Sequence, residues 1–319
     1  MKTLLLLGLT LLLNGESEHY IKDLKQRDQN NSSKILYSKK RNNSEGWSVY
    51  SIDPNGLNGE IIIPFSRGMG EYNPFPSPDG NTIIFNTYRY GGWKLATYNV
   101  KSEKITRVTK ASNYFTNGNY SPNGEKIVYE KNIGRSTHIC IADSDGMNEI
   151  VLTSNTESSE NRIPVWTPDE KSIIFYSEKN KVNDICMVNI ENRTQKNLTK
   201  NKDGNDFAPF ISPNGKQIAF FSDRNGHLDL YTMDILGNNQ TLLTKMIQND
   251  NNKYNYHTDS NTYWIFKNSW SPDGNYLVFS NATDNNIDLF TIHKNGSDLK
   301  NITNSPQSEY TPSWGLINN

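Results

Sequence analysis

One short phrase is written five times along the chain: a serine or threonine, a proline, an aspartate or asparagine and, in four copies, a glycine. Its prolines are Pro78, Pro122, Pro168, Pro213 and Pro272, so successive copies lie 44 to 59 residues apart. A period in this range indicates an array of similar units, each a small piece of supersecondary structure. The repeat therefore constrains the architecture of the chain more than any other feature of the sequence.

Each unit has the sequence pattern of a four-stranded sheet. The phrase leads into a short run of β-branched and aromatic residues, as in 82–85, and a second run follows after a polar turn, as in 94–97. A third run ends near a threonine, as in Val108-Thr109, and a run with proline or an aromatic residue precedes the phrase, as in 164–166. Alternating apolar residues punctuated by glycine, asparagine and proline predict strands in hairpins, and helical spacing is scarce.

The units number six if the end of the chain supplies the inner strand that the first unit lacks. Trp314 lies 44 residues after Trp270 of the sixth unit. We therefore predict an all-β fold: a single six-bladed β-propeller of four-stranded blades, closed by the C-terminal strand joining blade 1, which leaves few sheet edges exposed. The predicted propeller spans 34–319, with blades at 34–66 plus 308–314, 71–109, 115–154, 161–200, 206–245 and 264–304.

The N-terminus predicts export. Lys2 precedes an apolar run from Leu4 to Leu13, which matches the charged and hydrophobic regions of a secretory signal and is too short to span a bilayer. A core strand is the alternative for this run. We expect a signal peptide at 1–15, a polar linker at 16–33, and a periplasmic or secreted monomer that is not inserted in a membrane. The formal net charge of −1 disfavours nucleic acid as a partner.

The fifth unit carries a family resemblance. A strand with a proline and an aromatic residue leads into the phrase at 212–215, and an Ile-x-Phe strand follows. After these come the turn Ser-Asp-Arg-Asn-Gly at 222–226, the strand Asp-Leu-Tyr at 229–231 and a closing Leu-Thr at 243–244. This order resembles the TolB-type propeller repeat, and the resemblance extends over residues 34–314.

The resemblance is more specific for a fold than for a function. Propellers similar to this one form the partner-binding half of TolB, the gating domain of prolyl-oligopeptidase-like peptidases and the body of oligogalacturonate lyases. We expect the chain to resemble the propeller half of TolB without its N-terminal α/β domain, because only 16–33 separates the leader from the first unit. The sequence has no Gly-x-Ser-x-Gly motif of a hydrolase. Function must therefore be argued from a site.

The histidines do not predict a catalytic metal site. They share no register in the repeat and no His-x-x-x-His spacing, which a zinc or lyase centre would favour. The five are His19, His138, His227, His257 and His293. No cofactor is expected, the metal ligands are unknown, and a divalent cation in the central channel is left open.

Four polar residues stand at equivalent places near the start of the predicted inner strands: Glu71, Asn161, Asp206 and Glu309. In an up-and-down blade, the second-to-third-strand turns and the connections between blades share one face, and the phrase lies on the other. We predict that the four residues project at the channel mouth on the first face, where they would bind a cation or a basic peptide. The alternative is that they hydrogen-bond turns or neighbouring inner strands.

The one long interval between phrases predicts a loop on the same face. It leaves about fourteen extra residues around 246–263, and a long loop in a compact repeat is either functional or disordered. Aromatic residues and histidine of this loop would form a contact surface with residues from the turns of the first two blades. The candidates are Tyr254, Tyr256, His257 and Tyr263 in the loop, and Trp47, Tyr88, Arg89, Tyr90 and Trp93 in the turns. A solvated asparagine-rich loop is the alternative.

Together these features predict an exported, non-catalytic propeller that binds a protein or peptide over its channel mouth. The family resemblance adds an envelope complex of the Tol–Pal kind as a setting. Two alternatives stay open at this point. One is a carbohydrate-active enzyme of the lyase or glycosidase type that uses the channel mouth, and the other is a purely structural envelope protein.

Overall fold

The repeated phrase forms a tight turn whose side chain completes the hydrogen bonding. In the first copy, the Gly80 amide donates to the carbonyl of Ser77 (2.9 Å), and the Thr82 amide donates to the Ser77 hydroxyl (3.0 Å). Gly80 has a φ of 70°, a left-handed conformation that a residue without a Cβ adopts readily. The third copy places Glu170 here, at a φ of 58°. The turn reverses the chain, so that the strands on either side of it pair.

The computed structural model describes residues 33–42, 45–153, 160–179, 181–200, 204–245, 267–282 and 286–318. Every regular element in these ranges is a β-strand, which confirms the all-β prediction. The predicted signal peptide at 1–15 and all of the predicted linker except its last residue lie outside the described residues. Over the same ranges there is no helix with the length and apolar character needed to cross a bilayer.

The strands form antiparallel sheets that follow the sequence repeat, and we number the repeats as units 1 to 6. Unit 1 contains β24 (Glu309–Leu316), β1 (Ser33–Lys40), β2 (Trp47–Ile52) and β3 (Glu60–Ile63); unit 2 contains β4 (Glu71–Pro76), β5 (Thr82–Thr87), β6 (Lys94–Asn99) and β7 (Ile105–Arg107). Unit 3 contains β8 (Phe115–Tyr120), β9 (Lys126–Ile133), β10 (Ser136–Asp143) and β11 (Ile150–Val151); unit 4 contains β12 (Glu160–Trp166), β13 (Ser172–Lys179), β14 (Val182–Asn189) and β15 (Gln195–Asn197). Unit 5 contains β16 (Asp206–Ile211), β17 (Gln217–Ser222), β18 (Asp229–Asp234) and β19 (Thr241–Lys245); unit 6 contains β20 (Asn268–Trp270), β21 (Tyr276–Ala282), β22 (Ile287–His293) and β23 (Lys300–Asn301).

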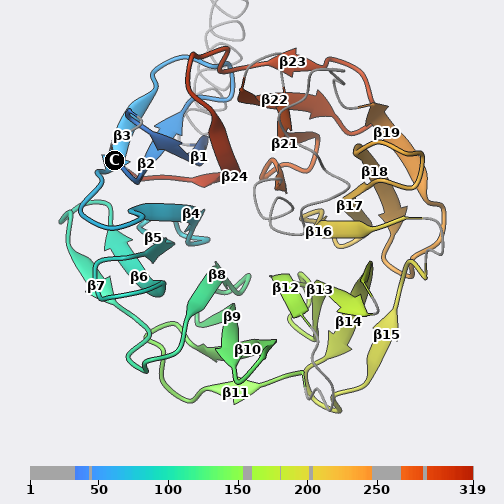
Figure 1. Cartoon of the computed structure of the whole chain (residues 1–319). Coiled ribbons are helices and arrows are strands. Elements are labelled where there is room, and N and C mark those ends of the chain that lie inside the picture. Colours follow the sequence, from blue (N-terminus) through green and yellow to red (C-terminus); the bar gives the residue numbers. More distant parts are fainter. Residues whose placement is uncertain are drawn as a thin grey trace, which may run out of the picture.

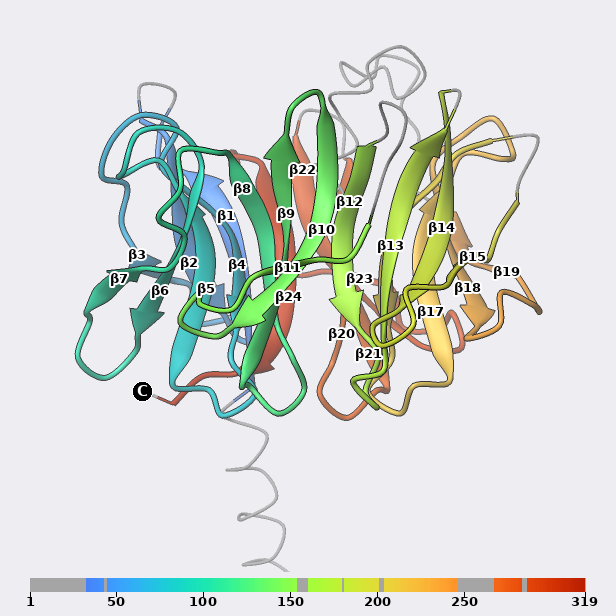
Figure 2. The same cartoon turned by 90° about the horizontal axis from the view of Figure 1, so that it is seen from below.

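The sheets are arranged radially around a central axis, with β4, β8, β12, β16 and β24 innermost (Figure 1). β24 pairs with β1, and Ile35 lies opposite Trp314, so the last described strand shares a sheet with the first. Units 3 and 4 are joined by a single parallel pair, Thr137 with Glu160. The molecule has two faces, seen in profile in Figure 2. We call the face with the second-to-third-strand turns and the connections between units the loop face, and the face with the repeated phrase the proline face.

The core lies between neighbouring sheets, and the second strand of each unit contributes to it together with the inner and third strands. Phe85, Phe175, Phe220 and Phe279 occupy the same place in four units, and none of them is exposed. Burying a side chain of this size contributes roughly 1.5–3 kcal/mol relative to leaving it in water. Tyr37 and Tyr129 occupy this place in the other two units and are also buried, so the same position of the repeat packs into the core in all six.

Five of the six inner strands in the described residues carry a bulge near their start. The third residue of the strand, or the fourth in β12, is left-handed in these five units, with φ between 49° and 56°, and the strand register shifts there. These residues are Thr311, Asn73, Asn117, Ile163 and Ala208. In three units the backbone amide of this residue donates a hydrogen bond to a side chain of the preceding unit. The bonds run from Asn73 to Ser38 Oγ (2.9 Å), from Asn117 to Asn86 Oδ1 (3.0 Å) and from Ile163 to Glu130 Oε1 (2.6 Å). Side chains from the second strand of one unit thus bind the backbone of the inner strand of the next unit.

Candidate functional site

Three of the four predicted channel-mouth residues are carboxylates that begin an inner strand and are completely buried. Each of them meets a cation from the second strand of its own unit or from the turn that follows it. These ion pairs bring one oxygen of each carboxylate within hydrogen-bonding distance of the cation. The contacts are Glu71 Oε1 with Arg89 Nε (3.0 Å), Asp206 Oδ1 with Arg224 Nη2 (2.8 Å) and Glu309 Oε1 with Lys39 Nζ (2.9 Å).

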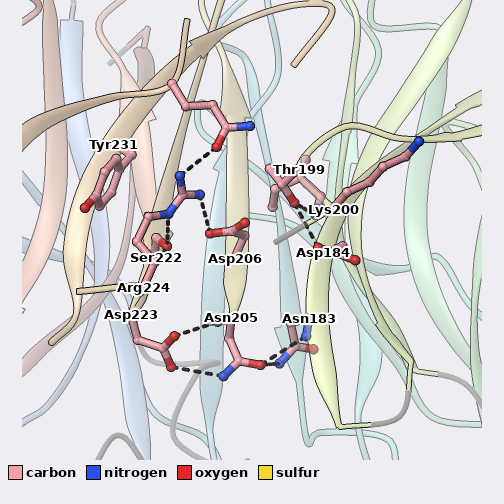
Figure 3. Close-up of polar contacts among 12 residues, drawn as sticks. Asn183, Asp184, Thr199, Lys200, Asn205, Asp206, Ser222, Asp223, Arg224 and Tyr231 are labelled. Atoms are coloured by element: carbon pink, nitrogen blue, oxygen red, sulfur yellow. Dashed lines mark hydrogen bonds and ion pairs between the residues drawn. The ribbon is translucent and has the colours of Figure 1, made fainter. Parts of the chain in front are cut away.

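The pair in unit 5 is the most elaborate of the three (Figure 3). Arg224 donates to Asp206, to the hydroxyl of Ser222 (2.8 Å) and to Oε1 of Gln240 (2.7 Å), and its guanidinium lies 4.8 Å from the ring centre of Tyr231. Burial raises the pKa of Asp206, and the hydrogen bond from Arg224 opposes this shift. The guanidinium is therefore held on several sides and fixes the start of β16 against the β17–β18 turn.

The fourth predicted residue, Asn161, is also buried and donates from Nδ2 to the carbonyl of Thr137 (3.1 Å) in the neighbouring unit. Burial likewise raises the pKa of Glu71 and of Glu309. These contacts are those of the structural alternative, in which the four residues tie inner strands to turns and neighbours. Their binding of a cation or a basic peptide stays a prediction. In the part of the chain that the structure describes, no three His, Cys, Asp or Glu side chains are grouped as metal ligands.

A chain of polar side chains crosses the central channel. Lys267, which stands four residues before the phrase as Asn73 does, donates from Nζ to Asn73 Oδ1. Asn73 donates to Asn117 (2.6 Å), and Asn117 donates to Glu130 Oε1. Glu130 also accepts from the hydroxyl of Thr116 (2.9 Å). The chain connects units 6, 2 and 3 through the centre of the molecule, and sequence reasoning did not identify it.

Lys267 is held in this network away from water. Its side chain is buried, and burial lowers the pKa of Lys267 to about 7, with the charge of Glu130 acting in the opposite direction. The space around it measures only about 10 Å³, which is about the volume needed for one water molecule. Toward the proline face, Phe75 and Phe210 approach across the channel with ring centres 6.1 Å apart. The channel is therefore filled by side chains at this level.

On the proline face the channel opens into a pocket of about 290 Å³. Its floor contains Phe75, Val165 and Phe210, and prolines of the repeated phrase line its rim. Sequence reasoning assigned this face no role. The signal that could have found the pocket is the phrase itself, because a radial repeat gathers equivalent prolines around one axis.

On the loop face, three of the predicted aromatic residues come together between units 1 and 2. Trp47 packs on Tyr72 with ring centres 4.8 Å apart, Tyr72 lies 6.3 Å from Trp93, and Trp93 lies 5.2 Å from Tyr88, edge to face. Tyr310 of β24 closes the group, 6.5 Å from Trp47. We call these five residues the aromatic cluster. Tyr72 and Tyr310 belong to inner strands and were not predicted.

The remaining predicted loop-face residues have separate positions. Arg89 pairs with Glu71, as described, and also donates to the carbonyl of Pro64 (3.3 Å). Tyr90 faces the guanidinium of Arg107, 5.1 Å from its ring centre. The predicted residues of the long interval lie outside the described residues: Tyr254, Tyr256, His257 and Tyr263.

Basic residues surround the aromatic cluster, and sequence reasoning missed them as a group. Lys40 lies 4.8 Å above the ring of Trp47, and Lys94 lies 5.7 Å from that of the exposed Tyr114. Arg41 is exposed beside Lys40. The signal that could have revealed them is the run Lys39-Lys40-Arg41, placed where the repeat predicts a loop-face turn.

Comparisons with known proteins agree with this architecture. The family model described as TolB beta propeller domain matches residues 45–202 and 138–268. The Tol-Pal system protein TolB of Anaeromyxobacter sp. (strain K) is 28% identical over 109 residues, 34% of this chain and 24% of the relative. The protein of the same name from Francisella tularensis subsp. mediasiatica (strain FSC147) is 24% identical over 217 residues, 52% of this chain and 48% of the relative. The chain thus spans less than half the length of these curated relatives.

A solved structure shows the same fold at low sequence identity. The crystal structure of TolB from Acinetobacter baumannii superposes with a TM-score of 0.73 at 18% identity, over 89% of this chain and 66% of that chain. At this identity the likeness bears on the fold alone.

Proposed function

The chain belongs to the TolB β-propeller domain family, and on this basis we propose that it is an exported, non-catalytic propeller that binds a protein or peptide on its loop face. In this proposal the six units form one closed ring of six blades, and β24 completes the first blade. The pairing of β24 with β1 and the radial arrangement of the sheets support the closed ring. The proposal needs no cofactor.

An envelope complex is the proposed setting. The two bacterial relatives are named Tol-Pal system proteins, which supports an envelope-associated role for a propeller of this family. The predicted signal peptide at 1–15 supports export to the periplasm or beyond it.

The aromatic cluster is the observation that carries the proposal. Tyr88 and Trp93 are only half-buried, although they lie against a well-packed group of rings. Tryptophan, tyrosine and arginine are the residues that most often dominate the binding energy of protein interfaces. Here they gather where the turns of units 1 and 2 meet, on a rigid scaffold of strands, as recognition surfaces commonly do.

Capture of a partner from native envelope extract tests the proposal. We expect the immobilised mature protein to retain a partner, and the double variant Y88A/W93A to lose it while keeping the melting temperature within a few degrees. The matched control is L57A/M147A, which removes exposed apolar side chains from the proline face. Equal capture by both variants would contradict the site. Turnover of a glycan, lost in Glu71→Gln or Glu309→Gln, would instead support the carbohydrate-active alternative.

A further inference from the structure

The exposed charge on the loop face is positive around the aromatic cluster. The turns and connections of units 1 and 2, at 39–47, 64–71, 88–94 and 108–115, contain seven lysines and arginines but only two carboxylates, Glu45 and Glu71. The formal net charge of the whole chain is −1, so this excess is local to the face. A surface that concentrates one sign of charge attracts and orients a partner of the opposite sign.

Two carboxylates near this surface are buried and therefore do not reduce its positive charge toward a partner. Glu71 and Glu309 have no exposed area, and each is already neutralised by a cation of its own unit. Of the five cations outside these pairs, Lys94 is buried, Lys40 is partly exposed and the other three are exposed. Arg41 and Arg67 are exposed in the turn after β1 and in the β3–β4 connection, and Lys110 is exposed in the β7–β8 connection. The predicted acidic ring is thus internal, and the surface that a partner meets is basic.

Two partly exposed aromatic side chains of the cluster pack edge to face on this surface. The rings of Tyr88 and Trp93 are almost perpendicular, at 89°, whereas Trp47 and Tyr72 are buried. Successive bases of a nucleic acid stack on a series of open aromatic faces. A single edge-to-face pair suits one apolar side chain of a peptide better. The exposed Tyr114, close to Lys94, extends the same surface toward unit 3.

From this arrangement we infer that the loop face over units 1 and 2 binds an acidic peptide segment that carries an aromatic or aliphatic anchor residue. The anchor packs beside Tyr88 and Trp93, and its acidic neighbours pair with Arg41, Arg67 and Lys110. The inference rests on the proposed function and reverses the charge expected of the partner, because a mouth lined by free carboxylates would select a basic segment. The surface lies along the upper rim of Figure 2, where the turns of units 1 and 2 meet.

Two labelled synthetic peptides of equal length test the sign of the charge. Each has one central tryptophan, flanked in one by glutamates and in the other by lysines. We expect the mature protein to bind the glutamate peptide, with an affinity that falls about tenfold or more as salt rises to several times the physiological level, because exposed charge pairs are screened. Stronger binding of the lysine peptide would overturn the inference. So would tighter binding of polygalacturonate than of the glutamate peptide, which would assign the surface to a polysaccharide.

Charge reversal tests the location. R41E/R67E should weaken binding of the glutamate peptide about tenfold or more, since it replaces attraction by repulsion at two exposed sites. The matched control is K171E/K216E, which makes the same change in net charge at exposed lysines of the proline face. Equal affinity in the two variants would overturn the inference. If Y88A/W93A abolishes capture of the natural partner while R41E/R67E and added salt leave it unchanged, the proposed function stands and the acidic partner does not.

Discussion

Lys267 is an ionisable group that the fold holds out of water, and its surroundings determine its pKa. The side chain is buried in the channel and bonded to Asn73, and the carboxylate of Glu130 lies at the other end of the polar chain, beyond two asparagines. An ammonium in such a place loses its hydration without a direct counter-ion, so the pKa of Lys267 falls from 10.5 to about 7. The network thus gives the channel a defined polar centre and makes stability depend on pH.

Removing this amine should change the pH dependence of stability. Between about pH 7 and pH 10 the unfolded wild-type chain holds a proton on Lys267 that the folded protein lacks. The free energy of unfolding of the wild type, measured relative to K267M, should therefore rise with pH by up to about 1.4 kcal/mol per unit. Below about pH 6.5 the amine is charged in both states, so the difference should be flat. Denaturant titrations across this range measure it, and a constant offset at every pH would contradict the assignment.

The elements of this protein depend on turns that require a positive φ. Gly124 in the second copy of the phrase has a φ of 76°, and a Cβ built there would meet nothing closer than Pro78 Cδ at 3.6 Å. Gly237, in the β18–β19 turn, has a φ of 89°, but its Cβ would lie 2.3 Å from the carbonyl oxygen of Leu198 in unit 4. The first glycine is needed only for its backbone conformation. The second also allows two neighbouring units to approach closely.

Substituting alanine for each of these glycines should distinguish the free-energy cost of a left-handed backbone from the cost of a steric clash between units. Gly124→Ala should lower the free energy of unfolding by about 1–2 kcal/mol, the cost of placing an L-residue in the left-handed region. Gly237→Ala should cost clearly more, because a backbone carbonyl of the next unit must also move. Chemical denaturation of both variants measures the difference. Equal losses would show that units 4 and 5 can separate at this point without a penalty.

At the scale of the whole molecule, the first and last described strands share one sheet. β24 pairs with β1 along most of its length, and Ser38 bonds to Thr311 through their hydroxyls (2.9 Å). Without β24, β1 would become an exposed inner edge in the middle of the fold, and unpaired edges promote association between chains. In the proposed closed ring, the last strand would contribute to the stability of every unit through the continuity of the array.

Deleting residues 309–319 should disrupt folding of the entire protein, not of unit 1 alone. We expect a broad unfolding transition at lower temperature and a shift toward large species in size-exclusion chromatography. Deletion of Asn319 alone is the control, and it should leave both measurements unchanged. A truncated protein that stays monomeric and melts in one sharp transition would show that units 1 to 6 are stable without this closure.

Much of the fold could be predicted because its determinants are local. The phrase specifies its own turn through Ser77 and Gly80, and four similar residues recur at the same place in other units. The candidate site was harder to predict, because the environment of a side chain depends on residues distant in sequence. Nothing near Glu71 in the sequence indicates that it is completely buried, and Lys267 meets a residue 194 positions away. The basic run at 39–41 was visible, but its importance depends on which carboxylates are buried.

The β1–β24 pair also determines how the molecule responds to mechanical load. Ser33 lies opposite Leu316, so the two strands enter and leave their sheet at the same edge. A protein tethered at one end and pulled at the other would load the hydrogen bonds between these strands one after another, from that edge inward. Strands opened in this unzipping geometry yield at much lower force than strands sheared along their length. Tension between the ends would therefore open unit 1 first, while the other sheets are still intact.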